Sequence, residues 1–264
     1  MNGFSAQALA GRHAAVTGAS RGIGLAIVEE LARLGADVTL LGRDENRLAQ
    51  QAERLRTQYG HRAEWFVVDV ARPDSIVEAF AKAQDRIGAV GILVNNAGVA
   101  SAAPMLRTSL EEWNRLLAVD LTGAFVGTQQ VLKSMISAGF GRIVNVASTA
   151  GLTGYAYVTG YCAAKHGLIG FTRALAIEVA RSGVTVNAVC PGYTDTAIVE
   201  DTVAKIVAKT GRTPEHALAE LTAHNPQARL IRPEEVASAV AWLCLPQSAS
   251  VTGQSILVAG GELM

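Results

Sequence analysis

Short apolar runs alternate along the chain with longer stretches in which apolar residues recur at helical spacing. This alternation is typical of a parallel sheet covered by helices on both faces. Because the short runs lack alternating polar residues, they predict strands that are buried on both sides. Seven such strands are expected, over residues 14–17, 38–41, 65–68, 92–94, 143–146, 184–189 and 256–258.

Four of the intervening helices have recognisable ends. The third is expected to begin with a capping box, formed either by Thr108 with Glu111 or by Ser109 with Glu112. The four helices are expected over residues 25–34 before Gly35, from Pro73 to about Gly88, from the capping box to about residue 138, and over 161–181 before Gly183.

Residues 192–232 break the alternation, because they contain no strand pattern. Two helices are expected there, over 197–209 and 214–223. Loops at the carboxyl ends of strands are where open α/β sheets bind ligands, so this insertion predicts a helical lid over a substrate pocket. No linker or internal repeat interrupts the rest, and residues 1–264 are expected to form one domain.

Composition narrows the class of partner. The chain has 264 residues, of which 50% are hydrophobic, and this is enough for a full core. Lysine plus arginine and aspartate plus glutamate both total 23, so the net charge is zero. Neither nucleic acid nor a membrane surface is therefore an expected partner, and a small molecule is.

Three cysteines and the N-terminus bear on location. Cys162, Cys190 and Cys244 are odd in number and lie far apart, which argues against a disulfide framework. Residues 1–11 do not resemble a signal peptide, and no apolar run reaches the length of a membrane span. A cytoplasmic protein is expected. None of the five histidines has metal-ligand spacing, so no catalytic metal is expected.

A glycine-rich turn follows the first predicted strand and opens the first helix. Gly18, Gly22 and Gly24 stand where glycines let the backbone approach a pyrophosphate at a helix N-terminus. Their spacing is not GxGxxG, so that fingerprint fails. Taken alone, the turn could serve chain geometry only.

The sequence resembles the short-chain dehydrogenases/reductases through several motifs along nearly its whole length. TGASRGIG at residues 17–24 is similar to the family's cofactor turn, and NNAG at residues 95–98 to its second motif. Ser148, the Tyr161/Lys165 pair and the Pro191–Gly192 step follow at the family's spacing. The resemblance implies a doubly wound Rossmann fold with a seven-stranded parallel sheet. It also implies cofactor contacts by Gly18, Ser20, Arg21, Gly22, Ile23, Gly24, Arg43, Asp69, Val70, Asn95, Ala97, Gly98, Tyr161, Lys165, Pro191, Gly192, Thr194 and Thr196.

Some of these positions have simpler interpretations. Asp69 ends the third predicted strand, where the resemblance implies an adenine contact, but an aspartate there could equally cap the next turn. Thr194 and Thr196 are expected at the nicotinamide carboxamide, or in a plain strand-to-helix turn.

The residues after the second predicted strand favour NADPH over NADH. An acidic residue there binds the ribose 2′-hydroxyl, whereas an arginine accommodates a 2′-phosphate. This chain has Arg43 there, with Arg21 as a second cation, and Asp44 is expected to lie outside the ribose contact. Alternatively, both arginines are merely solvated.

Tyr161 and Lys165 lie four residues apart in a predicted helix and therefore share a face. A tyrosine of ordinary pKa, about 10, is a poor acid or base at neutrality. An adjacent ammonium and a cationic nicotinamide favour the phenolate and lower that pKa. Ser148, at the carboxyl end of the fifth predicted strand, is placed to orient a substrate oxygen. Tyr161, Lys165 and Ser148 are therefore the candidate catalytic residues.

Asp120 departs from the family pattern. The family commonly has asparagine where this chain has Asp120, in a segment that resembles VNLTG. The resemblance implies that this position helps to hold a water linked to the lysine, largely through its backbone carbonyl. Asp120 could keep this role as a fourth catalytic residue, or its charge near Lys165 could perturb the tyrosine.

The substrate expected from the resemblance is a 3-oxoacyl thioester or polyketide-like ketone. Ser148, Tyr155 and Tyr161 are the candidate substrate contacts, while Tyr157 and Met105 could line the pocket or pack under the lid. Lid cations at Lys205, Lys209 and Arg212 could meet a substrate phosphate or form a solvated helix face.

Other functions stay open on sequence grounds. A dehydrogenase of free cyclic, aromatic or steroid-type alcohols is one alternative, and an NADP(H)-binding regulator without turnover is another. The C-terminal segment resembles the one that packs across subunits in family tetramers, so a homo-oligomer, either tetramer or dimer, is implied.

Overall fold

One sheet of seven parallel strands forms the centre of the protein. The computed structural model describes residue 5 and residues 7–263, apart from the side chains of residues 198 and 205. The strand order is β3-β2-β1-β4-β5-β6-β7. The strands are β1 (His13–Thr17), β2 (Asp37–Gly42), β3 (Ala63–Val67), β4 (Ile92–Asn95), β5 (Gly141–Val146), β6 (Val184–Pro191) and β7 (Ser255–Val258). Each of the seven predicted strands is present, and the doubly wound fold is confirmed.

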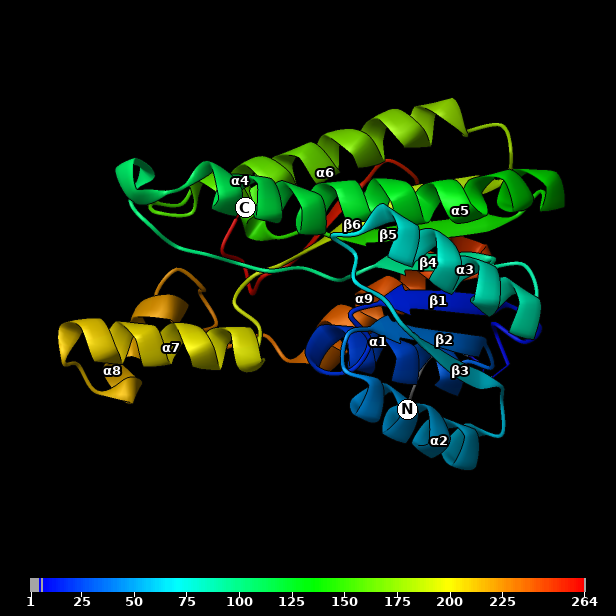
Figure 1. Ribbon diagram of the computed structural model, residues 1–264, viewed down its shortest axis with the longest axis horizontal. Helices are drawn as coiled ribbons and strands as arrows, with labels where there is room; N and C mark the ends of the chain where they lie inside the picture. The colour runs from blue at the N-terminus through cyan, green and yellow to red at the C-terminus, as the bar shows by residue number, and fades with distance from the viewer. Residues whose placement is uncertain (1–4, 6, 264) are drawn as a thin grey trace.

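Helices cover both faces of this sheet (Figure 1). On one face lie α1 (Gly22–Arg33), α2 (Glu45–Tyr59) and α9 (Pro233–Cys244), and on the other lie α3 (Pro73–Ile87), α4 (Leu110–Leu117), α5 (Gly123–Ala138) and α6 (Thr159–Glu178). Short turns of 3₁₀ helix lie at η1 (Met105–Arg107), η3 (Thr149–Gly151) and η4 (Pro246–Ser248). The order of strands reverses between β1 and β4, which makes the crevice at their carboxyl ends the expected ligand site.

The core is divided between the two faces because neighbouring strand residues point in opposite directions. Val16 packs with α1 and α9, whereas Ala15 packs with the cluster that holds Phe80 of α3. Polar side chains are also buried in the sheet, and His13 is one of them. The His13 ring bonds to the carbonyl oxygen of Gly88 through Nδ1 and to the Thr39 hydroxyl through Nε2, both at 2.8 Å.

Two predictions about helix starts and stops can be checked directly. Gly35 follows α1 with a φ of +95°, the left-handed backbone region that favours glycine after a helix end. At α4, the hydroxyl of Ser109 accepts the N–H of Glu112, so Ser109 is the N-cap. The Glu112 carboxylate accepts from Arg115, and the described contacts include only the Ser109 half of the predicted capping box. The predicted long helix is in fact α4 and α5 joined by a π-helical turn, η2 (Ala118–Thr122).

Two predictions were wrong in detail. The outer strands β3 and β7 are not buried on both sides, since Val67 is 49% exposed and Leu257 39% exposed. Both strands lie at an edge of the sheet, where one neighbour is missing. Helix α6 ends at Glu178 rather than Arg181, because the chain must turn through Gly183, at φ +76°, to enter β6.

The insertion between β6 and α9 contains the two predicted lid helices, α7 (Ala197–Thr210) and α8 (Pro214–Thr222). They project from the body of the molecule at the carboxyl end of β6 (Figure 1). Both ends of the insertion meet, because Thr194 and Ile231 form an isolated parallel bridge.

Candidate active site

The glycine turn between β1 and α1 allows three segments to approach closely. Gly18 has a φ of +67°, and a Cβ there would lie 2.9 Å from the side-chain nitrogen of Asn96. A Cβ on Gly24 would lie 2.2 Å from the carbonyl oxygen of Gly18. No side chain caps the N-terminus of α1, and its first turn carries no acidic residue. These free N–H groups and the bare backbone fit a dinucleotide pyrophosphate.

The NNAG motif, residues 95–98, holds the glycine turn in place. The Thr17 hydroxyl accepts the N–H groups of Asn96 and Ala97, both at 3.0 Å. In return, the Asn96 side chain donates to the carbonyl oxygens of Thr17 at 2.8 Å and Gly18 at 3.3 Å. Asn96 was not among the predicted site residues, and its role depends on contacts between segments about 80 residues apart.

Asn95 faces the interior instead. Its side-chain nitrogen donates to Asn145 Oδ1 at 2.8 Å and makes longer contacts with Thr128 and the carbonyl oxygen of Ala124. Asn145 in turn donates to the hydroxyl of Thr172 on α6 at 2.8 Å. The Asn95 side chain is therefore occupied within the core, and any cofactor contact by this residue would come from its backbone.

Asp69 caps the turn that follows β3, which was the alternative to an adenine contact. Its Oδ1 accepts the N–H of Ala71 at 3.0 Å, and its own N–H donates to the Ser75 hydroxyl at 3.1 Å. The neighbouring Val70 touches the start of α5, because a Cβ on Gly123 would lie 2.9 Å from its carbonyl oxygen. Asp69 and Val70 thus lie at the rim of the crevice, with one carboxylate oxygen committed to the turn.

The candidate phosphate-binding cations are exposed, as a 2′-phosphate site requires. Arg21 and Arg43 are both at the surface, and neither has an ion-pair partner in the described part of the chain. Asp44 is committed elsewhere, because it caps α2 by accepting the N–H of Arg47 at 3.1 Å and pairs with that side chain. Its engagement in the helix cap favours the prediction that Asp44 lies outside the ribose contact.

Ser148 and Tyr161 meet at the carboxyl end of β5. The Ser148 hydroxyl accepts the N–H of Ala150 at 3.1 Å, which fixes it at the start of η3. Tyr161, in the first turn of α6, is partly exposed to the crevice and hydrogen-bonds Ser148. Both hydroxyls therefore face the place where a substrate oxygen would lie.

Lys165 lies beneath Tyr161, with its Nζ 5.6 Å from the centre of the tyrosine ring. Lys165 Nζ donates to the carbonyl oxygen of Val146 at 3.0 Å and pairs with Asp120 Oδ1 at 3.2 Å. The side chains of both charged residues are buried, 4% exposed for Lys165 and fully covered for Asp120. All four candidate catalytic residues are therefore brought together.

The electrostatics of this cluster differ from the expectation for Tyr161. Burial raises the pKa of Tyr161 above its ordinary value of 10.0, and this outweighs the ammonium of Lys165 and the hydrogen bond with Ser148, which lower it. The Asp120 carboxylate raises the same pKa further. The lysine acts in the predicted direction, but burial has the larger effect on this pKa.

The segment after β6 connects the lid to the glycine turn. Thr194 is buried, and its hydroxyl donates to the carbonyl oxygen of Gly192 at 3.0 Å, so the turn is partly self-satisfied. Thr196 precedes α7 and packs on the cofactor turn, since a Cβ on Gly22 would lie 3.2 Å from its methyl group. Pro191 ends β6 in register with Val258. This segment lies beside the glycine turn.

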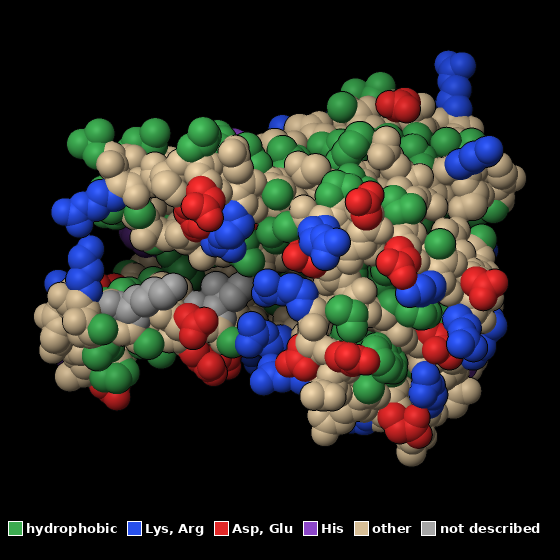
Figure 2. Space-filling model, viewed as in Figure 1, with side chains coloured by type: hydrophobic (Ala, Val, Ile, Leu, Met, Phe, Trp, Pro, Cys, Tyr) green, Lys and Arg blue, Asp and Glu red, His purple; other side chains and the backbone are tan. Residues whose placement is uncertain are grey.

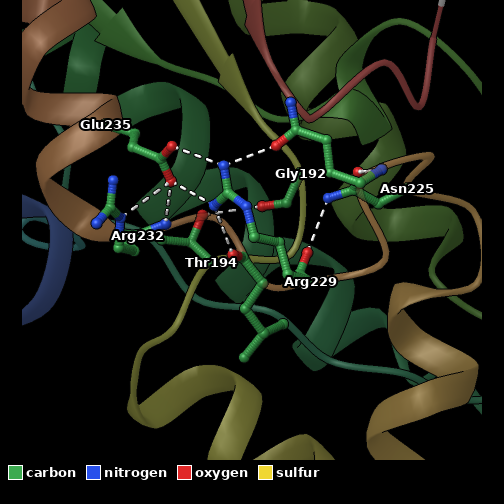
Figure 3. A network of polar contacts seen from close by, with 8 residues as sticks. Gly192, Thr194, Asn225, Arg229, Arg232 and Glu235 are labelled. Atoms are coloured by element: carbon green, nitrogen blue, oxygen red, sulfur yellow. Dashed lines mark hydrogen bonds and ion pairs between the residues drawn. The ribbon is translucent and has the colours of Figure 1, made fainter.

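Polar contacts anchor the far end of the lid to α9 (Figure 3). Arg229 donates to both carboxylate oxygens of Glu235, at 2.7 and 2.8 Å. Asn225 donates to the carbonyl oxygen of Arg229 at 2.8 Å. Glu235 also accepts the backbone N–H of Arg232 at 2.8 Å, which closes the N-terminus of α9.

Glu262, which was not among the predicted site residues, lies on the expected substrate side of the crevice. Tyr155 donates its hydroxyl to Glu262, in the C-terminal segment, and burial raises the pKa of Tyr155. A Cβ on Gly192 would lie 2.8 Å from Glu262 Oε2. Glu262 therefore closes one side of this region, and only the tertiary fold brings it there.

Other expected substrate contacts lie at the surface. Tyr157 and Met105 are each 64% exposed, so they do not pack under the lid. On the lid, Arg212 pairs with Glu220 of α8 and Lys209 is exposed, while the Lys205 side chain lies outside the described residues. Figure 2 shows the surface hollowed between the lid and the body of the molecule.

Among the described residues, no helix has both the length and the apolar character of a membrane span. The described histidine, cysteine, aspartate and glutamate side chains include no group of three that could hold a metal ion.

The fold is that of an α/β oxidoreductase, and Ser148, Tyr161 and Lys165 lie together where β5 and α6 border the crevice. The sequence profile described as short chain dehydrogenase matches residues 12–228. The chain therefore belongs to the short-chain dehydrogenase family, and it is an enzyme of that class.

Individual relatives agree with this assignment. The chain is 41% identical to granaticin polyketide synthase putative ketoacyl reductase 1 of Streptomyces violaceoruber, over 94% of this chain and 92% of that protein. It is 38% identical to 3-oxoacyl-(acyl-carrier-protein) reductase FabG of Aquifex aeolicus (strain VF5), over 96% and 98%. A crystal structure of an actinorhodin polyketide ketoreductase variant with NADPH is similar at a TM-score of 0.91 and 39% identity, over 98% of this chain and 99% of that one.

Proposed function

We propose that this enzyme is an NADPH-dependent ketoreductase that acts on 3-oxoacyl thioesters or polyketide-like ketones. The observation that carries the proposal is the meeting of Ser148, Tyr161 and Lys165 at the carboxyl end of β5, in the crevice bordered by the glycine turn. The names of the relatives, two polyketide ketoreductases and a 3-oxoacyl reductase, support the substrate class.

Tyr161, Ser148 and Lys165 each have a separate role in this reaction. A bound nicotinamide dinucleotide supplies the hydride. Tyr161 donates its proton to the carbonyl oxygen in the reductive direction and removes it in the oxidative one. Ser148 orients that oxygen and stabilises the charge that develops on it. Lys165 has three donors, of which one bonds Val146 and one faces Asp120, so the third is available for a ribose hydroxyl.

The cofactor's phosphates would be held at the α1 N-terminus by Gly18, Ser20, Gly22, Ile23 and Gly24, and its 2′-phosphate by Arg21 and Arg43. Support comes from the exposure of both arginines and from the engagement of Asp44 in the helix cap.

We expect Arg43→Ala to lower kcat/KM for NADPH by roughly tenfold or more, the loss typical of one charge-assisted hydrogen bond, and to leave kcat/KM for NADH unaffected. Arg47→Ala is the matched control. A wild-type preference for NADH would reject the assignment.

Turnover is tested with a panel of 3-oxoacyl thioesters against free cyclic and aromatic ketones. The thioesters are expected to give the higher kcat/KM. Tyr161→Phe is expected to bind NADPH normally and to lose turnover, because the proton donor is gone. Wild-type activity in that variant would refute the role of Tyr161. Activity on free ketones alone would instead support the alcohol dehydrogenase alternative, and NADPH binding without any turnover would support a regulator.

We also propose that the enzyme is a cytoplasmic homo-oligomer. A homo-oligomer, tetramer or dimer, is supported by the exposure of the edge strand β7, where Leu257 is 39% exposed. Light scattering after size exclusion would give the mass directly, and a monomer would contradict it. A cytoplasmic location is proposed with it, and cell fractionation tests it.

A further inference from the structure

Asp120 is the charged residue of the site whose side chain is completely buried. It lies in the π-helical turn η2, closed by the N–H of Gly123 donating to the carbonyl oxygen of Ala118. Such single π turns are often found at functional sites. The Asp120 carboxylate accepts the N–H of Val99, at 3.2 and 3.4 Å for its two oxygens, and is 3.2 Å from Lys165 Nζ.

The Asp120–Lys165 ion pair is tightly packed against the backbone of Gly98. A Cβ on Gly98 would lie 2.8 Å from Asp120 Oδ1 and 3.5 Å from Lys165 Nζ. The last glycine of the NNAG motif therefore lies directly over the pair. Because both charged side chains are buried, solvent screens their interaction little.

We propose that Asp120 is a positioning residue that acts through Lys165 and sets the pH range in which Tyr161 works, and this inference rests on the proposed ketoreductase function. An ionised Asp120 neutralises the ammonium that would otherwise favour the Tyr161 phenolate. The carboxylate holds Lys165 charged and in place, and it shifts base catalysis by Tyr161 to higher pH. The same effect keeps Tyr161 protonated at neutrality, which is the form that ketone reduction needs.

The directions of the pKa shifts agree with this geometry. Burial lowers the pKa of Lys165, but Asp120 and Tyr161 more than offset this, so the lysine pKa is raised. The pKa of Asp120 is raised above its ordinary value of 3.8, because burial outweighs Lys165 and the Val99 N–H; the geometric contacts with these two groups are what favour the carboxylate. The remaining ionisable groups that act on the cluster are Arg115 from α4, Cys162 from α6, Cys190 from β6 and Tyr193 after β6.

The decisive variant is Asp120→Asn, which removes the charge and keeps an oxygen for the Val99 N–H. In enzyme without cofactor, the ultraviolet absorbance of the Tyr161 phenolate is titrated as the difference between each protein and its Tyr161→Phe derivative. We expect its midpoint at lower pH in Asp120→Asn than in wild type. Glu178→Gln removes an exposed carboxylate from the same helix as Tyr161 and is expected to leave the midpoint unchanged.

The second readout is the pH profile of kcat/KM for alcohol oxidation. Its rising limb is expected to move to lower pH in Asp120→Asn, with kcat/KM at pH 7 increased roughly tenfold, because each unit of pKa changes the phenolate fraction tenfold. For ketone reduction the falling limb moves the same way.

Two results separate the inference from the proposed function. An unchanged or higher titration midpoint in Asp120→Asn would overturn the role of Asp120, whatever the activity. A lower midpoint with no ketone or alcohol turned over by wild type would keep the inference about the ion pair and reject the ketoreductase proposal. If Asp120→Asn does not fold, Asp120→Ser provides a second neutral side chain for the same titration.

Discussion

Replacing Asn145 by alanine would remove the centre of a buried hydrogen-bond chain that joins β4, β5 and α6. Asn145 is fully buried, accepts from Asn95 at 2.8 Å and donates to Thr172 at 2.8 Å. A buried polar group that loses its partner costs about 1–3 kcal/mol. Asn95 keeps longer contacts of 3.3 and 3.4 Å, so the two losses together are expected to destabilise the fold by about 2–4 kcal/mol.

For a domain of this size that loss corresponds to a fall in Tm of roughly 5–15 °C, measured by circular dichroism at fixed protein concentration. Thr185→Val on the adjacent strand β6 is the control, since the buried Thr185 hydroxyl has no hydrogen-bond partner among the described residues. This substitution is expected to keep or raise Tm. A fall of less than about 2 °C in Asn145→Ala, or simple additivity with Asn95→Ala, would refute the reasoning.

Three further predictions test other parts of the molecule. Burial lowers the pKa of His13 from 6.5, so its stabilisation is complete above that pH and is lost as pH falls; pH-dependent unfolding should show a loss of up to about 1.4 kcal/mol per unit, flattened in His13→Asn. Gly24→Ala is expected to weaken NADPH binding at least about tenfold in a fluorescence titration, because its Cβ would lie 2.2 Å from the oxygen of Gly18, whereas Gly170→Ala, which meets nothing within 4 Å, should bind normally. Arg229→Ala removes the bidentate anchor of the lid, so faster proteolysis within residues 195–228 and a higher substrate KM are expected; an unchanged digestion rate would contradict the anchor.

The strands, and the meeting of Ser148, Tyr161 and Lys165, could be predicted because their signals are local. Each strand is an apolar run, and the glycine turn, Tyr161 and Lys165 carry their spacing in the chain itself. Helix α2 was not among the predicted elements, although Leu48, Ala52 and Leu55 form its buried stripe. Only three of its 15 residues are buried, so its apolar pattern is weak. Helix α9 was also absent from the prediction.

The contacts that could not be predicted connect segments far apart in the sequence. Asn96 secures the glycine turn from about 80 residues away, and Glu262 reaches Tyr155 across 107 residues. The π turn that holds Asp120 adds one residue to a helical turn, and the apolar pattern of the long helix gives no sign of it. The exposure of β3 and β7 depends on which strands lie at the edges, and that order is set by the whole topology.

The direct pairing of Thr194 with Ile231 has a consequence for how such an enzyme can be altered. The lid leaves the sheet and returns to it at one point, so the intervening chain is a module closed at its base. Its length and sequence can change without moving β5, which ends before Ser148, or α6, which carries Tyr161 and Lys165. Exchanging residues 197–230 between relatives, with Thr196 kept beside the glycine turn, should therefore transfer substrate range and leave the proposed catalytic residues in place, which makes this segment the natural place to engineer a new specificity.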